Sequence, residues 1–545
     1  MVSKRLSGAD PLVRGRRPRR RLKGHSMKSF FLLVLIVPAF AAVNDPVRLD
    51  TGLVSGTAGK DAAVRVFKGI PFAAPPAGNL RWAAPKPPAH WDGVRKADEF
   101  SAICMQGQPG GGGRGGPARG GAAPARMSED CLYLNVWTAA QSAGDKRPVL
   151  VWFHPGGFTG GSGSAPGTDG ENFAKKGLVV VTVNYRLGVF GFFAHPELTK
   201  ESDRRASGNY GLLDQIAALQ WVQKNIAAFG GDPKRVTIDG DSAGAMSVGD
   251  LVASPLAKGL FERAIAESGS YIGLSVNPMR KLADAEQAGQ KAAESIGAAT
   301  LAELRARPAD EILGKLRSPG NVIIDGWFLP ENPADIFAAG KQNDVPLLVG
   351  SNKDEGTFFV RGGTADQFLE QSHRRFGDLT DTFLKLYPAG SDEEALASRL
   401  AAFRDELGFV MRKWAEMQAK TGKSKAYLYY FTHEPPSGNG PSPRGGFASG
   451  ATHGAEAQYV FENLLGNRPW TDLDRQLAGT ISSYWVNFAT TGDPNGKGLP
   501  RWPVFDGKKN DRAIVLGDQV EAGAPPNNPS QVAFYEALYD KITDR

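Results

Sequence analysis

The chain has 545 residues, of which 41% are hydrophobic and 22% are charged, a globular composition that allows a large buried core. Its net charge of +7 is unevenly distributed, because residues 1–28 contain ten Lys or Arg and one Asp, a net charge of +9. Residues 29–545 therefore carry a net charge of −2 (+7 minus +9), which argues against nucleic-acid binding by the folded part.

The first predicted element is a basic leader with a secretion signal, residues 1–42. Lys28 precedes an apolar run over residues 30–40, and Ala39-Phe40-Ala41 is typical of a signal-peptidase site. The run, of about eleven residues, is too short to span a bilayer, so we expect no stable membrane span in the mature chain. The alternative is an N-terminal membrane anchor. Residues 43–545 contain no separating linker and are predicted to form one domain of an exported protein, periplasmic or secreted.

A low-complexity segment at residues 107–125 consists mostly of Gly, Ala, Pro and Arg. It has no large apolar side chain and cannot bury enough surface to order itself, so we predict a surface loop. The two cysteines of the chain, Cys104 and Cys131, flank it. In an exported protein two cysteines most simply form one disulfide bond, the alternative being two unrelated thiols.

An α/β rhythm follows this loop. Apolar runs suited to buried strands occupy residues 148–153, 178–183, 235–239 and 345–350, and residues 212–226 have helical spacing of their apolar side chains. Buried strands alternating with helices predict a mostly parallel sheet covered on both faces. Two further stretches, about 300–315 and 367–420, are predicted to be helical insertions that lie over the end of the sheet and shape a pocket.

Between the strand at 235–239 and a helix predicted from Ala245 to Leu251 lies the sequence Gly240-Asp241-Ser242-Ala243-Gly244. A G-x-S-x-G turn between a strand and a helix is the setting of a nucleophile elbow. The glycines permit a sharp turn that exposes the Ser242 hydroxyl above the end of the sheet.

A serine hydroxyl needs a base, and histidine is the usual one. In α/β hydrolases the acid and then the histidine follow the serine, which leaves His373, His433 and His453. His373 stands beside two arginines on a predicted solvated helix face, and local chemistry favours His453 over His433 without deciding between them. The acid should follow the strand at 345–350, where spacing alone does not choose between Asp354 and Glu355.

An oxyanion hole requires backbone N–H groups that no side chain obstructs. The elbow offers one such group, on Ala243. The second source is expected in the loop after the strand at 148–153, where Gly156 and Gly157 stand in His154-Pro155-Gly156-Gly157-Phe158.

Several motifs together resemble the type-B carboxylesterase family, the cholinesterase-like branch of the α/β hydrolases. They extend from Val54 to Pro503 and include 67–71 (FKGIP), 128–136 (SEDCLYLNV), 183–188 (VNYRLG), 211–215 (GLLDQ), 229–233 (FGGDP), 487–489 (NFA) and 492–495 (GDPN). The resemblance implies an α/β-hydrolase fold with a large, mostly parallel central sheet flanked by helices.

The resemblance also implies the roles of the site residues. The family's acid is the Glu of a D-E-G sequence, here Glu355, and its base is the His of an H-G-x-E sequence, here His453. The oxyanion donors correspond to Gly156, Gly157 and Ala243, and Cys104 and Cys131 match the family's first disulfide. Two positions depart from the family: Pro155 replaces a glycine, and Asp241 replaces the glutamate before the nucleophile.

The expected function is hydrolysis of a small-molecule carboxylic ester by a Ser-His-Glu triad through an acyl-enzyme, with no cofactor and no metal. One alternative is a specialised exported esterase for bulky aromatic or plant-derived esters. An alternative of another class is a non-catalytic cholinesterase-like interaction protein, which the presence of Ser242, Glu355 and His453 disfavours.

Overall fold

The computed structural model describes residue 43 and residues 45–107, 126–272, 279–317, 321–438, 450–466, 468–508 and 511–543. All of them belong to one compact unit, Ala41–Arg545. The predicted leader and nearly all of the predicted loop at 107–125 lie outside the described residues.

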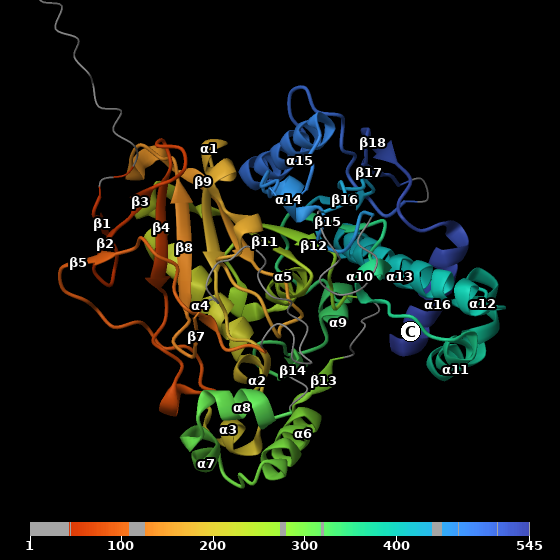
Figure 1. The fold of residues 1–545 in the computed structure, drawn as a ribbon, viewed down its shortest axis with the longest axis horizontal. Coiled ribbons are helices and arrows are strands. Elements are labelled where there is room, and N and C mark those ends of the chain that lie inside the picture. Colours follow the sequence, from red (N-terminus) through yellow and green to blue (C-terminus); the bar gives the residue numbers. More distant parts are fainter. Residues whose placement is uncertain are drawn as a thin grey trace, which may run out of the picture. The chain divides into compact units, whose positions relative to one another are not determined.

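An eleven-stranded sheet forms the centre of this unit (Figure 1). In spatial order its strands are β18 (Val520–Gly523), β17 (Ala513–Leu516), β16 (Ala426–Phe431), β15 (Leu347–Asn352), β12 (Arg263–Glu267), β11 (Gly231–Asp241), β9 (Arg147–Phe153), β10 (Val179–Val183), β8 (Tyr133–Thr138), β4 (Arg65–Pro71) and β3 (Thr57–Ala58). All neighbouring pairs from β10 to β17 are parallel, and the pairs at both edges are antiparallel. The predicted mostly parallel sheet is therefore confirmed.

Short strands outside this sheet are β1 (Val47–Arg48), β2 (Leu53–Ser55), β5 (Val94–Lys96), β6 (Ile103–Cys104), β7 (Met127–Ser128), β13 (Arg280–Lys281) and β14 (Ile323–Ile324). The helices are α1 (Glu171–Lys175), α2 (Gly188–Gly191), α3 (Pro196–Glu201), α4 (Tyr210–Asn225), α5 (Ala243–Ala253), α6 (Leu282–Ser295), α7 (Leu301–Ala306), α8 (Ala309–Lys315), α9 (Pro333–Ala338), α10 (Gly356–Phe359), α11 (Ala365–Phe376), α12 (Thr380–Leu386), α13 (Asp392–Thr421), α14 (Ala457–Val460), α15 (Asp472–Thr491) and α16 (Pro529–Thr543).

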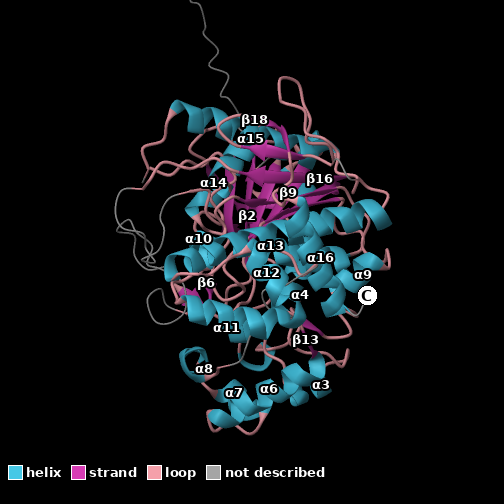
Figure 2. Ribbon diagram, turned by 90° about the vertical axis from the view of Figure 1, so that its right-hand side faces the viewer, coloured by secondary structure: helices cyan, strands magenta, loops and turns pink. Residues whose placement is uncertain are grey.

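Two hydrophobic clusters cover the two faces of the sheet. Side chains alternate along a strand, and accordingly Val149 and Val151 of β9 pack with residues of α4, α5 and α13, whereas Leu150 and Trp152 pack with α1, α14 and α15. Figure 2 shows the strands between α15 on one side and α13 and α4 on the other. Burial on both faces explains why these strands are continuous apolar runs.

The helical insertions occupy the predicted segments. The stretch at 300–315 contains α7 and α8, and the stretch at 367–420 contains most of α11, all of α12 and most of α13. In the described parts of the chain, no helix is both long enough and apolar enough to cross a membrane.

Candidate active site

The turn at Ser242 has the strand–turn–helix geometry that the sequence predicts. β11 ends at Asp241, α5 begins at Ala243, and Ser242 between them has φ 58° and ψ −116°. Few residues other than glycine adopt such a conformation, and it persists only where the surroundings enforce it. Here Ser242 N donates to Glu267 O at the end of β12, at 2.7 Å, and Met246 N donates to Ser242 O at 2.9 Å.

A glycine is required on the helix side of this turn. A Cβ atom on Gly244 would lie 2.0 Å from Phe153 O and 3.4 Å from His154 O, the residues at which β9 passes into the predicted oxyanion loop. Close packing of α5 against the end of β9 therefore sets the distance between the elbow and that loop.

The structure brings His453 and Glu355 together. Nδ1 of His453 lies 2.6 Å from Oε2 of Glu355, which is fully buried in the loop after β15. The other oxygen of Glu355 accepts hydrogen bonds from Ser268 Oγ at 2.6 Å and from Asn352 N at 2.8 Å, which fixes the carboxylate. Asp354, the other candidate acid, instead accepts a hydrogen bond from Ala451 N.

The second nitrogen of His453, Nε2, is buried and has no hydrogen-bond partner among the described residues. Phe358 and Phe359 of α10 pack on its ring, with ring centroids 5.3 and 4.7 Å away. The imidazole is thus fixed by a carboxylate at Nδ1 and enclosed by aromatic rings, with Nε2 available to another group.

His433, the other histidine that local chemistry allowed, has both ring nitrogens occupied. Its Nδ1 lies 2.6 Å from Asp518 Oδ1 and its Nε2 lies 2.9 Å from Asp474 Oδ1. This double contact ties the segment after β16 to α15 and leaves neither ring nitrogen available to another group. His373 is exposed on α11.

Two opposing effects act on the pKa of His453. Burial lowers it, but the charge of Glu355, the hydrogen bond to that carboxylate and the charges of Asp241 and Glu456 raise it, and the net result is a pKa of about 9. The charged imidazolium is therefore stabilised in this site.

Asp241 belongs to a set of four buried carboxyl groups, and sequence reasoning missed the other three, Asp239, Glu267 and Glu456. Burial raises the pKa of Asp241 to about 6 and that of Glu456 to about 8. Asp239 and Glu267 on the neighbouring strands are fully buried, and burial raises the pKa of each well above the usual range. The sequence did contain a signal for this set. Asp239 and Asp241 are two residues apart on β11, so their side chains lie on the same face of the sheet.

Tight hydrogen bonds hold this set in place. Tyr429 Oη donates to Glu456 at 3.2 Å, Asn352 Nδ2 donates to the other oxygen of Glu456, and Trp485 Nε1 of α15 donates to Glu267 at 2.9 Å. In the described parts of the chain, no group of three His, Cys, Asp or Glu side chains is arranged to hold a metal ion.

The predicted oxyanion loop has a backbone that requires glycine. Gly156 has φ 130°, and a Cβ atom there would lie 2.0 Å from Gly160 O; Gly157 has φ 62°. Tyr185 Oη donates to His154 O at 2.7 Å, and the two rings stack with centroids 4.3 Å apart. These contacts with Tyr185 hold the start of the loop in place, next to the turn at Ser242.

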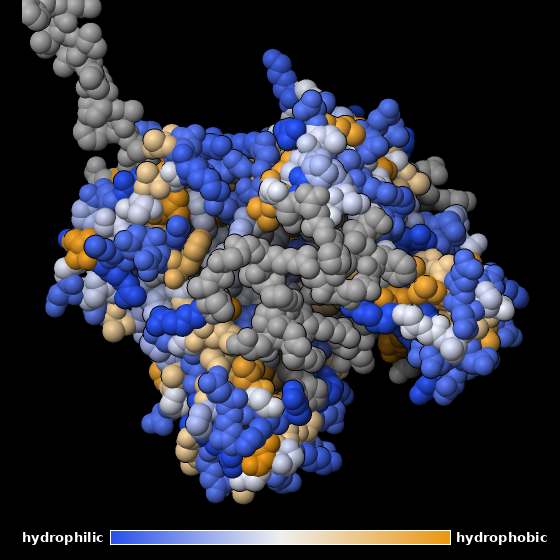
Figure 3. Space-filling view, in the orientation of Figure 1, coloured by the Kyte–Doolittle hydropathy of each residue, from blue (hydrophilic) through white to orange (hydrophobic). Residues whose placement is uncertain are grey.

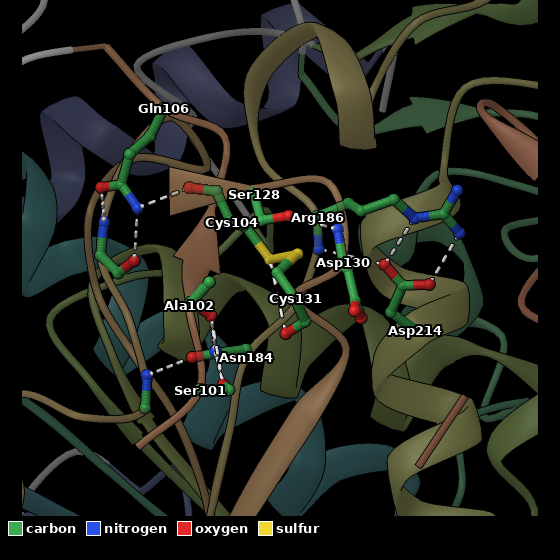
Figure 4. The surroundings of a disulfide bond; sticks show 12 residues. Ser101, Ala102, Cys104, Gln106, Ser128, Asp130, Cys131, Asn184, Arg186 and Asp214 are labelled. Atoms are coloured by element: carbon green, nitrogen blue, oxygen red, sulfur yellow. Dashed lines mark hydrogen bonds and ion pairs between the residues drawn. A yellow bond between two sulfur atoms is a disulfide. The ribbon is translucent and has the colours of Figure 1, made fainter. Parts of the chain in front are cut away.

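The predicted disulfide is confirmed: Cys104 is bonded to Cys131, with Cα atoms 5.0 Å apart (Figure 4). Beside it, Gln106 Nε2 donates to Cys104 O at 3.0 Å and to Gly161 O at 2.9 Å, while its Oε1 accepts from Gly161 N at 2.9 Å. One amide side chain therefore connects the disulfide segment to the end of the predicted oxyanion loop.

Comparisons with known proteins identify the family of the chain. The Carboxylesterase family model matches residues 44–534. The chain is 37% identical to a fumonisin B1 esterase of Sphingopyxis macrogoltabida, covering 91% of each chain, and 35% identical to the human cocaine esterase, covering 92% of each.

Solved structures show the same fold. A PNB esterase superposes with a TM-score of 0.75 at 31% identity, over 90% of this chain and 99% of the other. A carboxylesterase of Geobacillus stearothermophilus gives a TM-score of 0.73 at 33% identity over the same shares. The chain therefore belongs to the carboxylesterase family, within the type-B, cholinesterase-like branch of the α/β hydrolases, and is a serine carboxylic ester hydrolase.

Proposed function

We propose that Ser242, His453 and Glu355 form the catalytic triad of this esterase and that it acts through an acyl-enzyme. The observation that supports this assignment most directly is the 2.6 Å contact between His453 Nδ1 and Glu355 Oε2, combined with a buried, unpartnered Nε2. An Nδ1–H donated to Glu355 makes Nε2 the proton acceptor of the imidazole.

The reaction has two steps. His453 takes the proton of the Ser242 hydroxyl as Oγ attacks the ester carbonyl, and then gives that proton to the departing alcohol. Water, deprotonated by the same nitrogen, attacks the acyl-serine and releases the carboxylic acid. Glu355 keeps the imidazole in one tautomer and stabilises its charged form.

The developing oxyanion is stabilised by the N–H groups of Gly156, Gly157 and Ala243. The two glycines carry no side chain that would obstruct their N–H groups, and Ala243 is the first residue of α5, where the N–H groups have no acceptor within the helix. Each such donor contributes about 2.7–4 kcal/mol to lowering the barrier. The mechanism needs no metal and no organic cofactor.

The test is hydrolysis of 4-nitrophenyl acetate by Ser242→Ala. We expect a loss of roughly 10⁶-fold in kcat, as in serine-protease knockouts. Ser483→Ala, a change on α15 that removes a hydroxyl bonded only to a helix carbonyl, serves as the control and should leave the rate unchanged. Retained activity in Ser242→Ala would contradict the assignment, and an inactive parent enzyme would favour the non-catalytic alternative.

For the substrate, we propose a small-molecule ester, with a bulky aromatic or plant-derived ester as the specialised alternative. The similar proteins bear names as different as fumonisin B1 esterase, cocaine esterase and fatty acyl-CoA hydrolase. A panel of esters varied separately in acyl length and alcohol size distinguishes the two: a broad profile supports a general esterase, and a sharp maximum for bulky alcohols supports the specialised one.

We also propose that the protein is exported. The Cys104–Cys131 bond supports this, because disulfides persist mainly in oxidising compartments. Cell fractionation followed by N-terminal sequencing tests it: activity outside the cytoplasm, on a chain that begins near Ala42, is expected, and activity confined to the cytoplasm would contradict it.

A further inference from the structure

A cavity of about 270 Å³ lies between α11 and α13. Most of its apolar lining comes from four aromatic side chains, Phe368 and Phe376 of α11, Phe383 of α12 and Phe403 of α13. Figure 3 shows hydrophobic residues at the surface beside hydrophilic ones on the right-hand side, where Figure 1 places these helices. The cavity is large enough to hold a short hydrocarbon chain or one aromatic ring.

The polar part of the lining is strongly positive. Three arginines, Arg361, Arg375 and Arg399, line the cavity together with a single carboxylate, Glu406, which pairs with Arg375 at 2.5 Å. The lining therefore carries a net charge of +2 on an aromatic floor. Such a surface is complementary to an anion, because arginine binds carboxylates through paired N–H donors.

Arg399 is the best-positioned of these groups. Its Nη atoms donate to Gln371 Oε1 at 2.8 Å and to Thr364 O at 3.2 Å, and its guanidinium lies 5.0 Å from the centre of the Phe368 ring. Its Nε is buried and has no acceptor among the described residues. A buried N–H without an acceptor is unfavourable, and an incoming oxygen atom would supply that acceptor.

The cavity adjoins the proposed active site. Its wall residue Phe403 stacks on Phe359 with ring centroids 4.7 Å apart, and Phe359 in turn packs on the His453 ring. Arg361 lies two residues after Phe359 in the chain that leads from Glu355 through α10. One aromatic ring thus separates the cavity wall from the proposed catalytic histidine.

We propose that this cavity binds the carboxylate of an amphipathic molecule, with the hydrocarbon part of that molecule on the phenylalanine floor and its carboxylate on Arg399 and Arg361. The carboxylate can come from two sources: the remote acid group of an ester substrate, or a free carboxylic acid such as the product of hydrolysis. Only the first source depends on the proposed function.

The first experiment measures binding of a free acid without catalysis. Decanoate is titrated calorimetrically into the full-length enzyme, with decanamide as the uncharged comparison. Arg399→Gln and Arg361→Gln are each expected to weaken decanoate binding about tenfold or more, the effect of losing a charged hydrogen bond. Glu406→Gln should strengthen it, because that change frees Arg375.

The matched control is Arg374→Gln. Arg374 lies on the same helix, α11, but is exposed, pairs with Glu370 and does not line the cavity. It should leave decanoate binding unchanged. An equal loss in Arg374→Gln, or equal binding of decanoate and decanamide, would reject a built anion site.

The second experiment identifies where the bound carboxylate comes from. It compares a neutral ester, 4-nitrophenyl decanoate, with an acidic ester, the mono-4-nitrophenyl ester of decanedioic acid. If the cavity takes the substrate's own acid group, Arg399→Gln and Arg361→Gln raise KM about tenfold for the acidic ester and leave the neutral ester unchanged. If it takes only free acids, decanoate binding falls while both KM values stay the same.

The proposal is overturned if neither decanoate binding nor the KM of the acidic ester responds to the two substitutions. Arg361 is exposed, so its substitution remains informative even if Arg399→Gln fails to fold. Continued hydrolysis of the neutral ester by every arginine variant, and its loss only in Ser242→Ala, keeps a failure of this proposal distinct from a failure of the triad.

Discussion

Ser242 keeps its side chain in a backbone conformation that favours glycine. Strain of this kind is on the order of 1–3 kcal/mol. We therefore expect Ser242→Gly to be more stable than Ser242→Ala, by about 1 kcal/mol, and we expect both variants to be inactive. Thermal unfolding of the two variants side by side measures the difference. An equal or lower midpoint for the glycine variant would show that the turn is unstrained.

The raised pKa of His453 predicts an alkaline activity profile. A general base acts in its deprotonated form, and a pKa of about 9 moves deprotonation above the ordinary value of 6.5. We expect kcat/KM for a neutral ester to rise with pH from 6.5 to about 9. A profile that is already flat above pH 7 would contradict this expectation.

Asp241 gives a way to shift that profile. Its charge raises the pKa of His453, so Asp241→Asn should lower that pKa and move the rise in kcat/KM to lower pH. Asp250→Asn is the matched control, since Asp250 is also buried near the elbow, on α5, and its charge is not among the causes of the shift at His453. The electrostatic explanation would be refuted if the pH profile of kcat/KM moved in Asp250→Asn but not in Asp241→Asn.

At the scale of single elements, the space around two helical glycines predicts opposite effects for their substitution. Gly244→Ala would put a Cβ atom 2.0 Å from Phe153 O, so we expect a loss of at least about 1–3 kcal/mol in stability and a large loss of activity. Gly314→Ala in α8 meets nothing within 4 Å and should stabilise the protein by about 0.5–1 kcal/mol. Chemical denaturation measures both, and equal effects would contradict the packing argument.

The elements that sequence analysis located best are those buried on both faces. β9, β10 and α4 lie where continuous apolar runs and helical spacing predicted them. β15 is displaced by two residues, because its last positions, Ser351 and Asn352, are polar yet buried. Their partners come from distant segments, Asn352 for example donating to Thr452 O, and no local pattern contains that information.

The site residues divide in the same way, into those that a local motif identifies and those that depend on contacts between distant segments. The elbow and the oxyanion loop are local motifs of glycines, so sequence could identify Ser242, Gly156 and Gly157 as candidates. The choice of Glu355 over Asp354 required the family resemblance, and the contact with His453 spans 98 residues of sequence. The buried carboxyl groups of Glu267 and Glu456 escaped notice because their meeting depends on how β12 and the segment after His453 pack.

For the whole molecule, the Cys104–Cys131 bond closes a loop with a sequence separation of 27 residues. On the loop-entropy model it stabilises the folded state by about 3.5 kcal/mol. We expect the double variant Cys104→Ser, Cys131→Ser to unfold at a clearly lower denaturant concentration, and the parent enzyme to match it when reduced. Identical unfolding curves with and without reductant would contradict the prediction.

The spacing of the proposed triad along the chain has a consequence for folding. Residues 242, 355 and 453 follow β11, β15 and β16 in the chain. These strands lie close together in the sheet but far apart in the sequence. Long-range pairings of this kind form slowly. Because the chain is synthesised from its N-terminus, the segment that contains Ser242 is made long before the segment that contains His453. Reactivity toward esters is therefore acquired among the last events of folding. Its appearance indicates that the whole sheet has assembled.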